Sequence, residues 1–266
     1  MNYVKKKLLK ILEEDIGFGD ITSDILPDID SEGYIIAKED CYLSCLEYGK
    51  FLFESQGCGV TLLKKNGEFV RKDEKILEVT GKIKNILSTE RTVLNVLSRA
   101  FGITTVTKRC TEKVSARVAA TRKTVMRYLD KKAVEAGGGD THRYRLDDMI
   151  LIKDNHIAVL GLKECIQRAQ KLSFSKKIDV EVRTKKDAVT AAEMGVEIIM
   201  LDNMSPRKIK DVIQELKAKN LRKEVLIEAS GRITPENIEE YDVVDIISMG
   251  FLTHSVAAAD ISLEIV

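Results

Sequence analysis

Charged and polar side chains follow six short apolar runs in the second half of the chain. The densest case is residues 149–152, which lead directly into Lys153, Asp154, Asn155 and His156. A short continuous apolar run predicts a strand that is buried on both faces. Such strands normally end in a plain turn, so a cation, an acid, an amide and an imidazole at this end indicate a place where chemistry is done.

Five other predicted strands end in the same way. Their carboxyl ends carry Thr121-Arg122-Lys123, Glu181-Val182-Arg183, Asp202-Asn203, Glu228-Ala229-Ser230-Gly231 and Ser248-Met249-Gly250. The apolar runs alternate with helical patterns such as residues 185–195 and 206–220, and this alternation predicts a parallel sheet. Parallel strands share one direction, so all six ends lie at one edge of the sheet, which in a β/α barrel carries the active site.

The residue types at these ends predict a polyanionic ligand. Cations concentrate at the first two ends, where the chain places Arg122, Lys123, His142, Arg143, Lys153 and His156. Guanidinium groups bind carboxylates and phosphates through paired hydrogen bonds. Glu181 and Asp202 are carboxylates suited to sugar hydroxyls, to Mg²⁺ or to acid-base work. Glycines in "ASGR" and "SMGFLTHS", each followed by a helix, indicate a phosphate-binding cup.

Each feature also has a purely structural explanation. A charged residue just past a strand is most often solvated or caps a helix, and only the recurrence at six ends outweighs that explanation. The triple glycine at residues 137–139 lacks the G-x-G-x-x-G spacing of a dinucleotide site. From position alone, His142 and His156 are as well explained as structural histidines as they are as ligand-binding ones.

Composition limits the class of protein. A chain of 266 residues with 44% hydrophobic content can form one or two domains. A net charge of +1 supplies no global field for nucleic acid or an anionic membrane. No apolar stretch has the length of a membrane span, and the N-terminus lacks the apolar core of a secretion signal. The five cysteines are odd in number and lack metal-site spacing, which is typical of a reducing cytoplasm.

The first half of the chain predicts an α+β region without obvious chemistry. Residues 1–15 form an amphipathic helical pattern with lysines on the polar face. Short strands joined by polar turns follow, around one helix near residues 47–55. A long helical pattern begins near Leu87, and Gly102 is expected to break or bend it.

Several stretches closely resemble the quinolinate phosphoribosyltransferase family, the decarboxylating nicotinate-nucleotide pyrophosphorylases. They are "ERTVLNVLSRAFGIT", "ATRKT", "AVEAGGGDTHRYRLDDMILIKDNHI", "VEVRT", "MLDNM", "IEASGRI" and "ISMGFLTHS", preceded by "EDIGFGDITSDIL". The resemblance runs from about Leu12 to Ser255. It implies an N-terminal α/β sandwich domain over residues 1–101 and an open, seven-stranded parallel α/β barrel over residues 102–255, with the tail 256–266 a candidate to pack back on the first domain.

The resemblance also implies an activity. Members of the family transfer the phosphoribosyl group of phosphoribosyl pyrophosphate to quinolinate and release pyrophosphate and carbon dioxide, with Mg²⁺, to give nicotinate mononucleotide for NAD biosynthesis. It implies a homodimer in which Arg91 reaches the partner subunit's active site. Whether dimers assemble further is left open.

Roles carry over to matching residues. The resemblance assigns quinolinate binding to Arg91, Arg122, His142, Arg143 and Lys153. It assigns catalysis to Lys123, Glu181 and Asp202, and Mg²⁺ binding, direct or indirect, to Glu181 and Asp202. It assigns phosphoribosyl pyrophosphate binding to Thr121, Lys123, Glu181, Asp202, Ser230, Gly231, Arg232, Met249, Gly250, Phe251 and His254.

Two departures from the family pattern leave alternatives open. The loop after Thr124 is about two residues shorter than usual and lacks a proline, and Arg232 stands where a small or polar residue is common. One alternative is a related phosphoribosyltransferase or pyrophosphorylase of molybdenum metabolism that acts on another anionic base. Another is a catalytically silent barrel that senses an anionic metabolite, although simple carboxylate binding does not require Lys123, Glu181 and Asp202.

Overall fold

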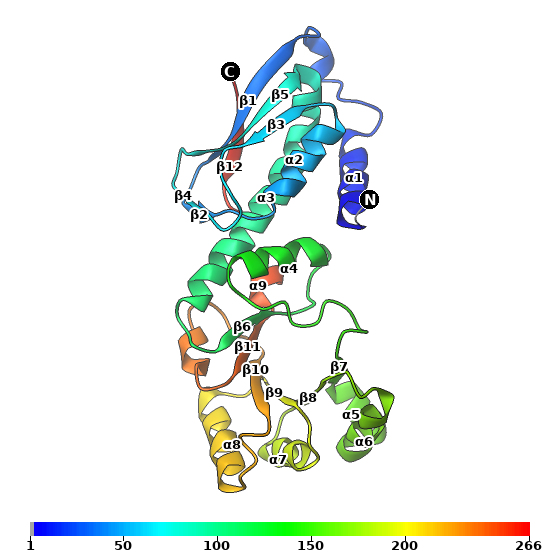
Figure 1. The fold of residues 1–266 in the computed structure, drawn as a ribbon, viewed down its shortest axis with the longest axis vertical. Coiled ribbons are helices and arrows are strands. Elements are labelled where there is room, and N and C mark those ends of the chain that lie inside the picture. The colour runs from blue at the N-terminus through cyan, green and yellow to red at the C-terminus, as the bar shows by residue number, and fades with distance from the viewer. Residues whose placement is uncertain (1–2) are drawn as a thin grey trace. The chain divides into compact units, whose positions relative to one another are not determined.

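A computed structural model describes residues 3–266, which divide into two compact units (Figure 1). Unit 1 comprises the described chain up to Lys108, then Met126–Gly138 and Val256–Val266. Unit 2 comprises Arg109–Val125 and Gly139–Ser255. The expected boundary after residue 101 lies inside helix α3 (Ile83–Thr111), and the segment Met126–Gly138 belongs to unit 1.

Unit 1 combines helices with an antiparallel sheet. Its helices are α1 (Tyr3–Ile16), η1 (Ser23–Ile25), α2 (Leu46–Ser55), most of α3 (Ile83–Thr111) and α4 (Arg127–Ala136), and its strands are β1 (Asp30–Ala37), β2 (Cys41–Tyr42), β3 (Gly59–Leu62), β4 (Phe69–Val70), β5 (Lys75–Lys82) and β12 (Ile261–Ile265). The main sheet has the order β12-β1-β5-β3, and β2 pairs with β4. The C-terminal strand β12 therefore forms an edge of the sheet that β1 begins.

Two sequence features of unit 1 have clear structural causes. The expected amphipathic helix is α1, which buries Val4, Leu8 and Leu12. The break expected at Gly102 is wrong, because α3 continues through this residue to Thr111. A Cβ added at Gly102 would lie 2.1 Å from the carbonyl oxygen of Ala257, so glycine is needed here for the close approach of the chain that leads into β12.

Unit 2 is built on a parallel sheet. Its strands are β6 (Arg117–Ala120), β7 (Ile150–Ile152), β8 (Ile178–Val182), β9 (Ile198–Asp202), β10 (Leu226–Ser230) and β11 (Ile246–Met249), and its helices are α5 (Asp154–Leu160), α6 (Leu162–Leu172), α7 (Lys185–Glu193), α8 (Pro206–Ala218), η2 (Ile238–Tyr241) and α9 (Phe251–His254). The strand order is β6-β11-β10-β9-β8-β7, and every neighbouring pair is parallel. The six strands predicted from the apolar runs are the six of this sheet.

In the described residues the parallel sheet has six strands, and where a seventh was expected the structure has an isolated parallel bridge beside β6. Asp140 pairs in parallel with Ala119 beside β6, through hydrogen bonds from Ala120 N to Asp140 O and from Asp140 N to Val118 O. Two residues later His142 takes a left-handed backbone with φ 51°. This conformation turns the chain away from an extended path, so pairing stops after one residue.

The register brings the functional strand ends side by side. Glu181 and Glu228 are both in register with Met200 of the strand between them, and Asp202 is in register with Ser230. Because side chains alternate along a strand, residues two apart share a face. The acids at the ends of β8, β9 and β10 therefore project to the same side of the sheet.

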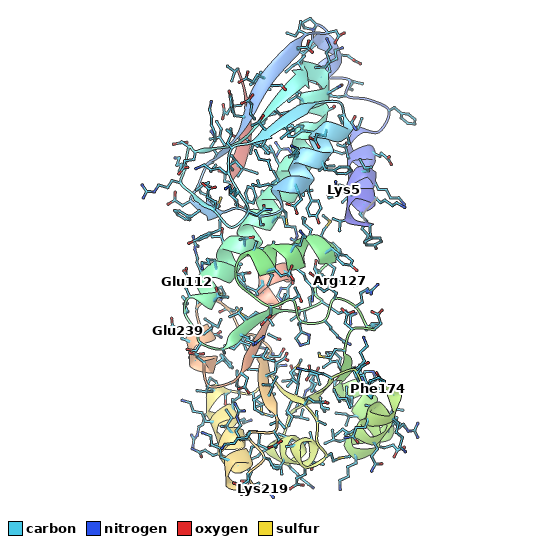
Figure 2. The ribbon with its side chains drawn as sticks, viewed as in Figure 1. Lys5, Glu112, Arg127, Phe174, Lys219 and Glu239 are labelled. Carbon is cyan, nitrogen blue, oxygen red and sulfur yellow. The ribbon has the colours of Figure 1, made fainter. Side chains whose placement is uncertain are left out.

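Helices α6, α7 and α8 of unit 2 each bury apolar residues against the core. Helix α8 begins with Ser205 as its N-cap and Pro206 in its first turn, and it buries Ile209, Val212, Ile213 and Leu216. Lys219, directly after α8, is exposed on the outside of unit 2 (Figure 2). Its Nζ pairs with Glu193 Oε1 at 3.3 Å. Within residues 3–266, no helix is both long and apolar enough to cross a membrane.

Candidate active site

A cavity of about 650 Å³ lies at the carboxyl edge of the unit 2 sheet. All of its lining residues come from unit 2: Ala120, Thr121, Arg122, Lys123, His142, Arg143, Leu151, Lys153, Glu181, Met200, Asp202, Asn203, Glu228, Ser230, Gly231, Arg232 and Ser248. Each of the six predicted strands contributes residues from its end or from the segment just beyond it. The parallel order of the sheet thus gathers at one cavity the groups that the sequence spaces over more than a hundred residues.

Most of the predicted site residues line this cavity. They are Thr121, Arg122, Lys123, His142, Arg143, Lys153, Glu181, Asp202, Ser230, Gly231 and Arg232. Met249, Gly250, Phe251 and His254 are not among the lining residues. Arg91 is an exposed residue of α3 in unit 1.

Helix α9 nevertheless adjoins the lining at Lys123. A Cβ added at Gly250 would lie 2.7 Å from Nε2 of His254 and 3.3 Å from the side chain of Lys123. The hydroxyl of Thr253 donates to the carbonyl oxygen of Lys123 at 3.2 Å. Gly250 and His254 therefore lie beside a lining residue, and the absence of a side chain at Gly250 leaves room for both neighbours.

The cations of the cavity are close enough to influence one another. Burial, and then the positive charge of Arg122, lower the pKa of Arg143 from its ordinary value. A guanidinium in this setting gains strongly from an anion, because the anion offsets both the desolvation and the repulsion. We call Arg122, His142, Arg143 and Lys153 the cation cage.

The two predicted acids are already engaged with cations. Lys153 Nζ lies 2.8 Å from Glu181 Oε2. Arg183 Nε lies 3.3 Å from Asp202 Oδ2, and the same oxygen accepts a hydrogen bond from Asn203 Nδ2 at 2.8 Å. Lysine and acid thus neutralise each other across the cavity, and an anion that binds Lys153 would compete with Glu181.

Unusual backbone conformations gather around the cavity. His142, Asn203 and Arg232 have φ values of 51°, 53° and 56°, in the left-handed region. This region costs a non-glycine residue about 1–2 kcal/mol. Gly231 has φ 99°, and a Cβ there would lie 2.5 Å from Asn203 Oδ1. Such strain collects where a functional geometry requires it, and Arg232, the departure from the family pattern, is one of these strained residues.

The structure adds two acids that the sequence reasoning did not assign, Glu228 and Asp179. Both side chains are fully buried, and Glu228 lines the cavity. Nε2 of His142 lies 3.2 Å from Glu228 Oε2 and 3.7 Å from Asp179 Oδ2. Burial, and then the charge of Glu228, raise the pKa of Asp179 well above its ordinary range. Their sequence signal is an acid inside an apolar run, as in "IDVEV" and "LIEAS".

The structure separates the two histidines that the sequence left undecided. His156 accepts a hydrogen bond from the backbone N–H of Lys153 at 2.9 Å, and its role at the start of α5 is that of a helix cap. His142 lines the cavity and meets the two buried acids. The functional interpretation therefore belongs to His142.

Comparison with known proteins gives consistent matches over the whole chain. Residues 20–101 match the family model of the quinolinate phosphoribosyl transferase N-terminal domain, and residues 102–264 match that of the C-terminal domain. A relative from Methanocaldococcus jannaschii, named a probable nicotinate-nucleotide pyrophosphorylase (carboxylating), is 46% identical over 100% of this chain and 98% of its own length. One of the same name from Bacillus subtilis is 38% identical over 100% and 95%.

Solved structures agree with these matches. A nicotinate-nucleotide pyrophosphorylase from Ehrlichia chaffeensis superposes with a TM-score of 0.93 at 29% identity, over 100% of this chain and 99% of that one. Another from Francisella tularensis gives a TM-score of 0.90 at 32% identity, over 99% and 96%. The likeness thus extends over both units.

Proposed function

Because the chain belongs to the quinolinate phosphoribosyl transferase family, we propose that it transfers a phosphoribosyl group from phosphoribosyl pyrophosphate to quinolinate and releases pyrophosphate and carbon dioxide. The observation that carries this proposal is a single cavity that joins the cation cage to Lys123, Glu181 and Asp202. The cage suits a dicarboxylate, and the two acids suit ribose hydroxyls. Simple binding of an anion would not require both sets.

The chemistry we propose is substitution at the anomeric carbon of the ribose. The bond to pyrophosphate breaks with its electron pair on the leaving oxygen, and the pyridine nitrogen of quinolinate supplies the pair for the new bond. Lys123 lines the cavity and offsets the negative charge that grows on the leaving group. No side-chain nucleophile is required, and much of the acceleration comes from holding both substrates in line.

Decarboxylation follows from the charge of the new ring nitrogen. The bond from the neighbouring ring carbon to its carboxylate breaks, and its electron pair stays on the ring beside the positive nitrogen. Carbon dioxide leaves, and a proton from solvent completes the ring carbon. The product is nicotinate mononucleotide, and the cage contributes by orienting the carboxylates.

The donor set at the cavity fits Mg²⁺. Glu181 and Asp202 are carboxylates on neighbouring strands that line one cavity, and hard oxygen ligands of this kind are what Mg²⁺ takes together with substrate phosphates. When bound, the ion would neutralise charge on the pyrophosphate group. Glu181 and Asp202 would hold it directly or through water.

We further propose a homodimer in the cytoplasm. Arg91 matches the family position that binds quinolinate, yet it is an exposed residue of unit 1 rather than a lining residue of the cavity. A two-fold assembly would supply one Arg91 to each partner's cage. The five cysteines are all free, in keeping with a reducing compartment.

The test is a direct assay. The protein is mixed with quinolinate, phosphoribosyl pyrophosphate and Mg²⁺, and nicotinate mononucleotide and carbon dioxide are measured. We expect both products in equal amounts. A panel of other anionic bases separates this activity from the alternative in molybdenum metabolism, which the names of the relatives do not favour. Binding of quinolinate without turnover of any base would leave the sensor hypothesis.

A second experiment separates the two half-sites. Glu181→Ala and Asp202→Ala are each expected to lower turnover with phosphoribosyl pyrophosphate by about 100-fold, since each removes charge placed for the transition state. Quinolinate binding should stay the same or tighten in Glu181→Ala, because Lys153 loses its ion-pair partner. Calorimetry with quinolinate alone checks this. Loss of quinolinate binding in both variants would reverse the assignment.

A further inference from the structure

Two carboxylates are buried at a site that has to bind anions. The side chains of Asp179 and Glu228 are 0% exposed. Within the described chain, Oδ1 and Oδ2 of Asp179 and Oε1 of Glu228 have no hydrogen-bond partner. Burying such oxygens without a partner is costly, and placing negative charge beneath an anion is more costly still. The arrangement therefore favours a hydrogen-bonding group between the acids and the ligand.

His142 is the group that stands between them. Its side chain is only 12% exposed, and its Nε2 lies within 3.2 Å of Glu228 and 3.7 Å of Asp179. Nε2 is thus engaged with the acids, and Nδ1, the second ring nitrogen, is left for another partner. The left-handed backbone of His142, φ 51°, shows that the chain tolerates strain to keep the ring here.

We infer that Asp179 and Glu228 are positioning residues that hold the imidazole of His142 in place to meet a carboxylate of the substrate. This inference rests on the proposed function, because it takes quinolinate as the ligand. The acids would act only through His142 and would not touch the substrate. Without the two acids the ring would have no hydrogen-bonding partner beneath it and would be free to rotate.

A divalent cation is the competing occupant. One ligand atom from each of His142, Asp179 and Glu228 lies within 4.8 Å of the others, which also suits a metal ion. The surrounding charge favours the positioning role instead, which needs no added ion. Arg143 and Lys153 already exert positive charge on Asp179, so a divalent cation would enter against their repulsion.

The test measures quinolinate and phosphoribosyl pyrophosphate binding separately by calorimetry. Glu228→Gln keeps the shape of the side chain and removes its charge, and Asp179→Asn is the second variant. We expect each to weaken quinolinate binding at least tenfold and to change phosphoribosyl pyrophosphate binding, with Mg²⁺, by less than about twofold. The matched control is Glu197→Gln, an acid whose Oε2 accepts from Ile178 N outside the cavity, and it should change neither constant.

A double-mutant cycle shows whether the acids act through the histidine. His142→Ala alone should also weaken quinolinate binding at least tenfold, and adding Glu228→Gln should weaken it little further. Additive losses, or equal losses for both substrates, would mean a general structural role and would overturn the inference. If Glu228→Gln does not fold, the cycle is run with Asp179→Asn.

Two further measurements keep the outcomes distinct. A chelator should leave quinolinate binding to the parent unchanged. If quinolinate binding instead requires one Zn²⁺ or Mn²⁺ per chain, and Glu228→Gln abolishes binding of that ion, the three residues form a metal site and the inference fails. Turnover of quinolinate by the parent tests the proposed function independently. If the parent turns over quinolinate but Glu228→Gln binds it as tightly as the parent does, the positioning role is refuted and the proposed function still holds.

Discussion

Buried charge is arranged differently in the two units. In unit 1, Arg99 donates from Nε and Nη2 to the two oxygens of Asp130 at 2.8 and 2.7 Å, and the Asp130 side chain is fully buried. In unit 2, His142 reaches Glu228 at 3.2 Å, and neither oxygen of Asp179 has a hydrogen-bond partner among the described residues. Both carboxylate oxygens of Asp130 therefore have hydrogen-bond partners, whereas those of Asp179 have none among the described residues.

The difference indicates what each cluster is for. A bidentate pair satisfies both groups and ties helix α3 to helix α4 within unit 1. An incomplete cluster beside a cavity keeps its interaction capacity for a ligand, at a cost to stability. We therefore expect changes in the first cluster to affect folding and changes around the second to affect binding.

The largest effect is expected from Arg91, a residue of unit 1. If Arg91 contributes to catalysis, unit 1 has a functional role as well as a structural one. Arg91→Ala and Lys123→Ala homodimers should each lose about 100-fold or more in activity. After subunit exchange, each mixed dimer holds one site with both residues intact and one site lacking both. Activity should return toward half that of the parent for each mixed dimer.

The measurement is turnover after exchange, with exchange verified by differently tagged subunits. Unmixed homodimers carried through the same procedure are the control. Verified exchange without any return of activity would show that Arg91 does not act across the dimer.

Changes in the cation cage should have the next largest effect. Arg143→Ala and Lys153→Ala each remove a charge-assisted hydrogen bond to an anion, at a cost of about 1.5–3 kcal/mol. Quinolinate affinity should fall about tenfold or more, as measured by calorimetry. Arg117→Ala, which removes an exposed arginine at the opposite end of β6, should leave it unchanged. Parent-like affinity in both cage variants would refute the cage.

The two buried aspartates should separate stability from binding. Asp130→Asn removes one charge from a buried pair and should lower the free energy of unfolding by about 2 kcal/mol. Asp179→Asn replaces a carboxyl group whose two oxygens have no hydrogen-bond partner among the described residues, and it should change this free energy by less than about 1 kcal/mol. Denaturant unfolding of both variants checks this. Equal losses would show that the two clusters are alike.

The smallest expected effect concerns buried cysteines, whose contribution to the pH dependence of stability should be the same in both units. Burial raises the pKa of Cys45 in unit 1 to about 12 and that of Cys110 in unit 2 to about 11, above the ordinary value of 9.0. Each thiol stays protonated in the folded chain, so its stabilising contribution is complete below pH 9 and is lost as pH rises from there toward the folded pKa.

At pH 9 half of an unfolded thiol is ionised, which corresponds to about 0.4 kcal/mol for each buried cysteine. The free energy of unfolding of the parent should fall between pH 7 and pH 9. In Cys45→Ala and in Cys110→Ala this fall should be smaller by about 0.4 kcal/mol. Denaturant unfolding at the two pH values, in reductant, measures it. A contrast between the two variants would mean that something other than burial sets these pKa values.

The sequence by itself determined the parallel sheet and most of the cavity. Apolar runs of strand length, alternating with helical periodicity, are local signals, and chain direction alone places their polar ends at one edge. For this reason the sequence alone predicts that Lys123, Lys153, Glu181 and Asp202 lie together, and all four line the cavity. A resemblance over most of the chain then supplied the reaction.

Only the tertiary structure decided what depends on contacts between distant segments. Gly102 suggested a helix break in the sequence, but glycine is needed at this position because the carbonyl group of Ala257 leaves no room for a Cβ. The seventh strand was invisible because a single residue, Asp140, makes its bridge. A pattern needs several residues, so neither feature leaves a periodic signal.

The buried acids show the same limit most clearly. His142 and Glu228 are 86 residues apart in the chain and 3.2 Å apart in space. An acid inside an apolar run is visible in the sequence, but whether it is paired, protonated or left open depends on which strands flank it and how deeply it lies. Register and burial are properties of the assembled sheet. They place Nε2 of His142 within 3.2 Å of Glu228 and 3.7 Å of Asp179.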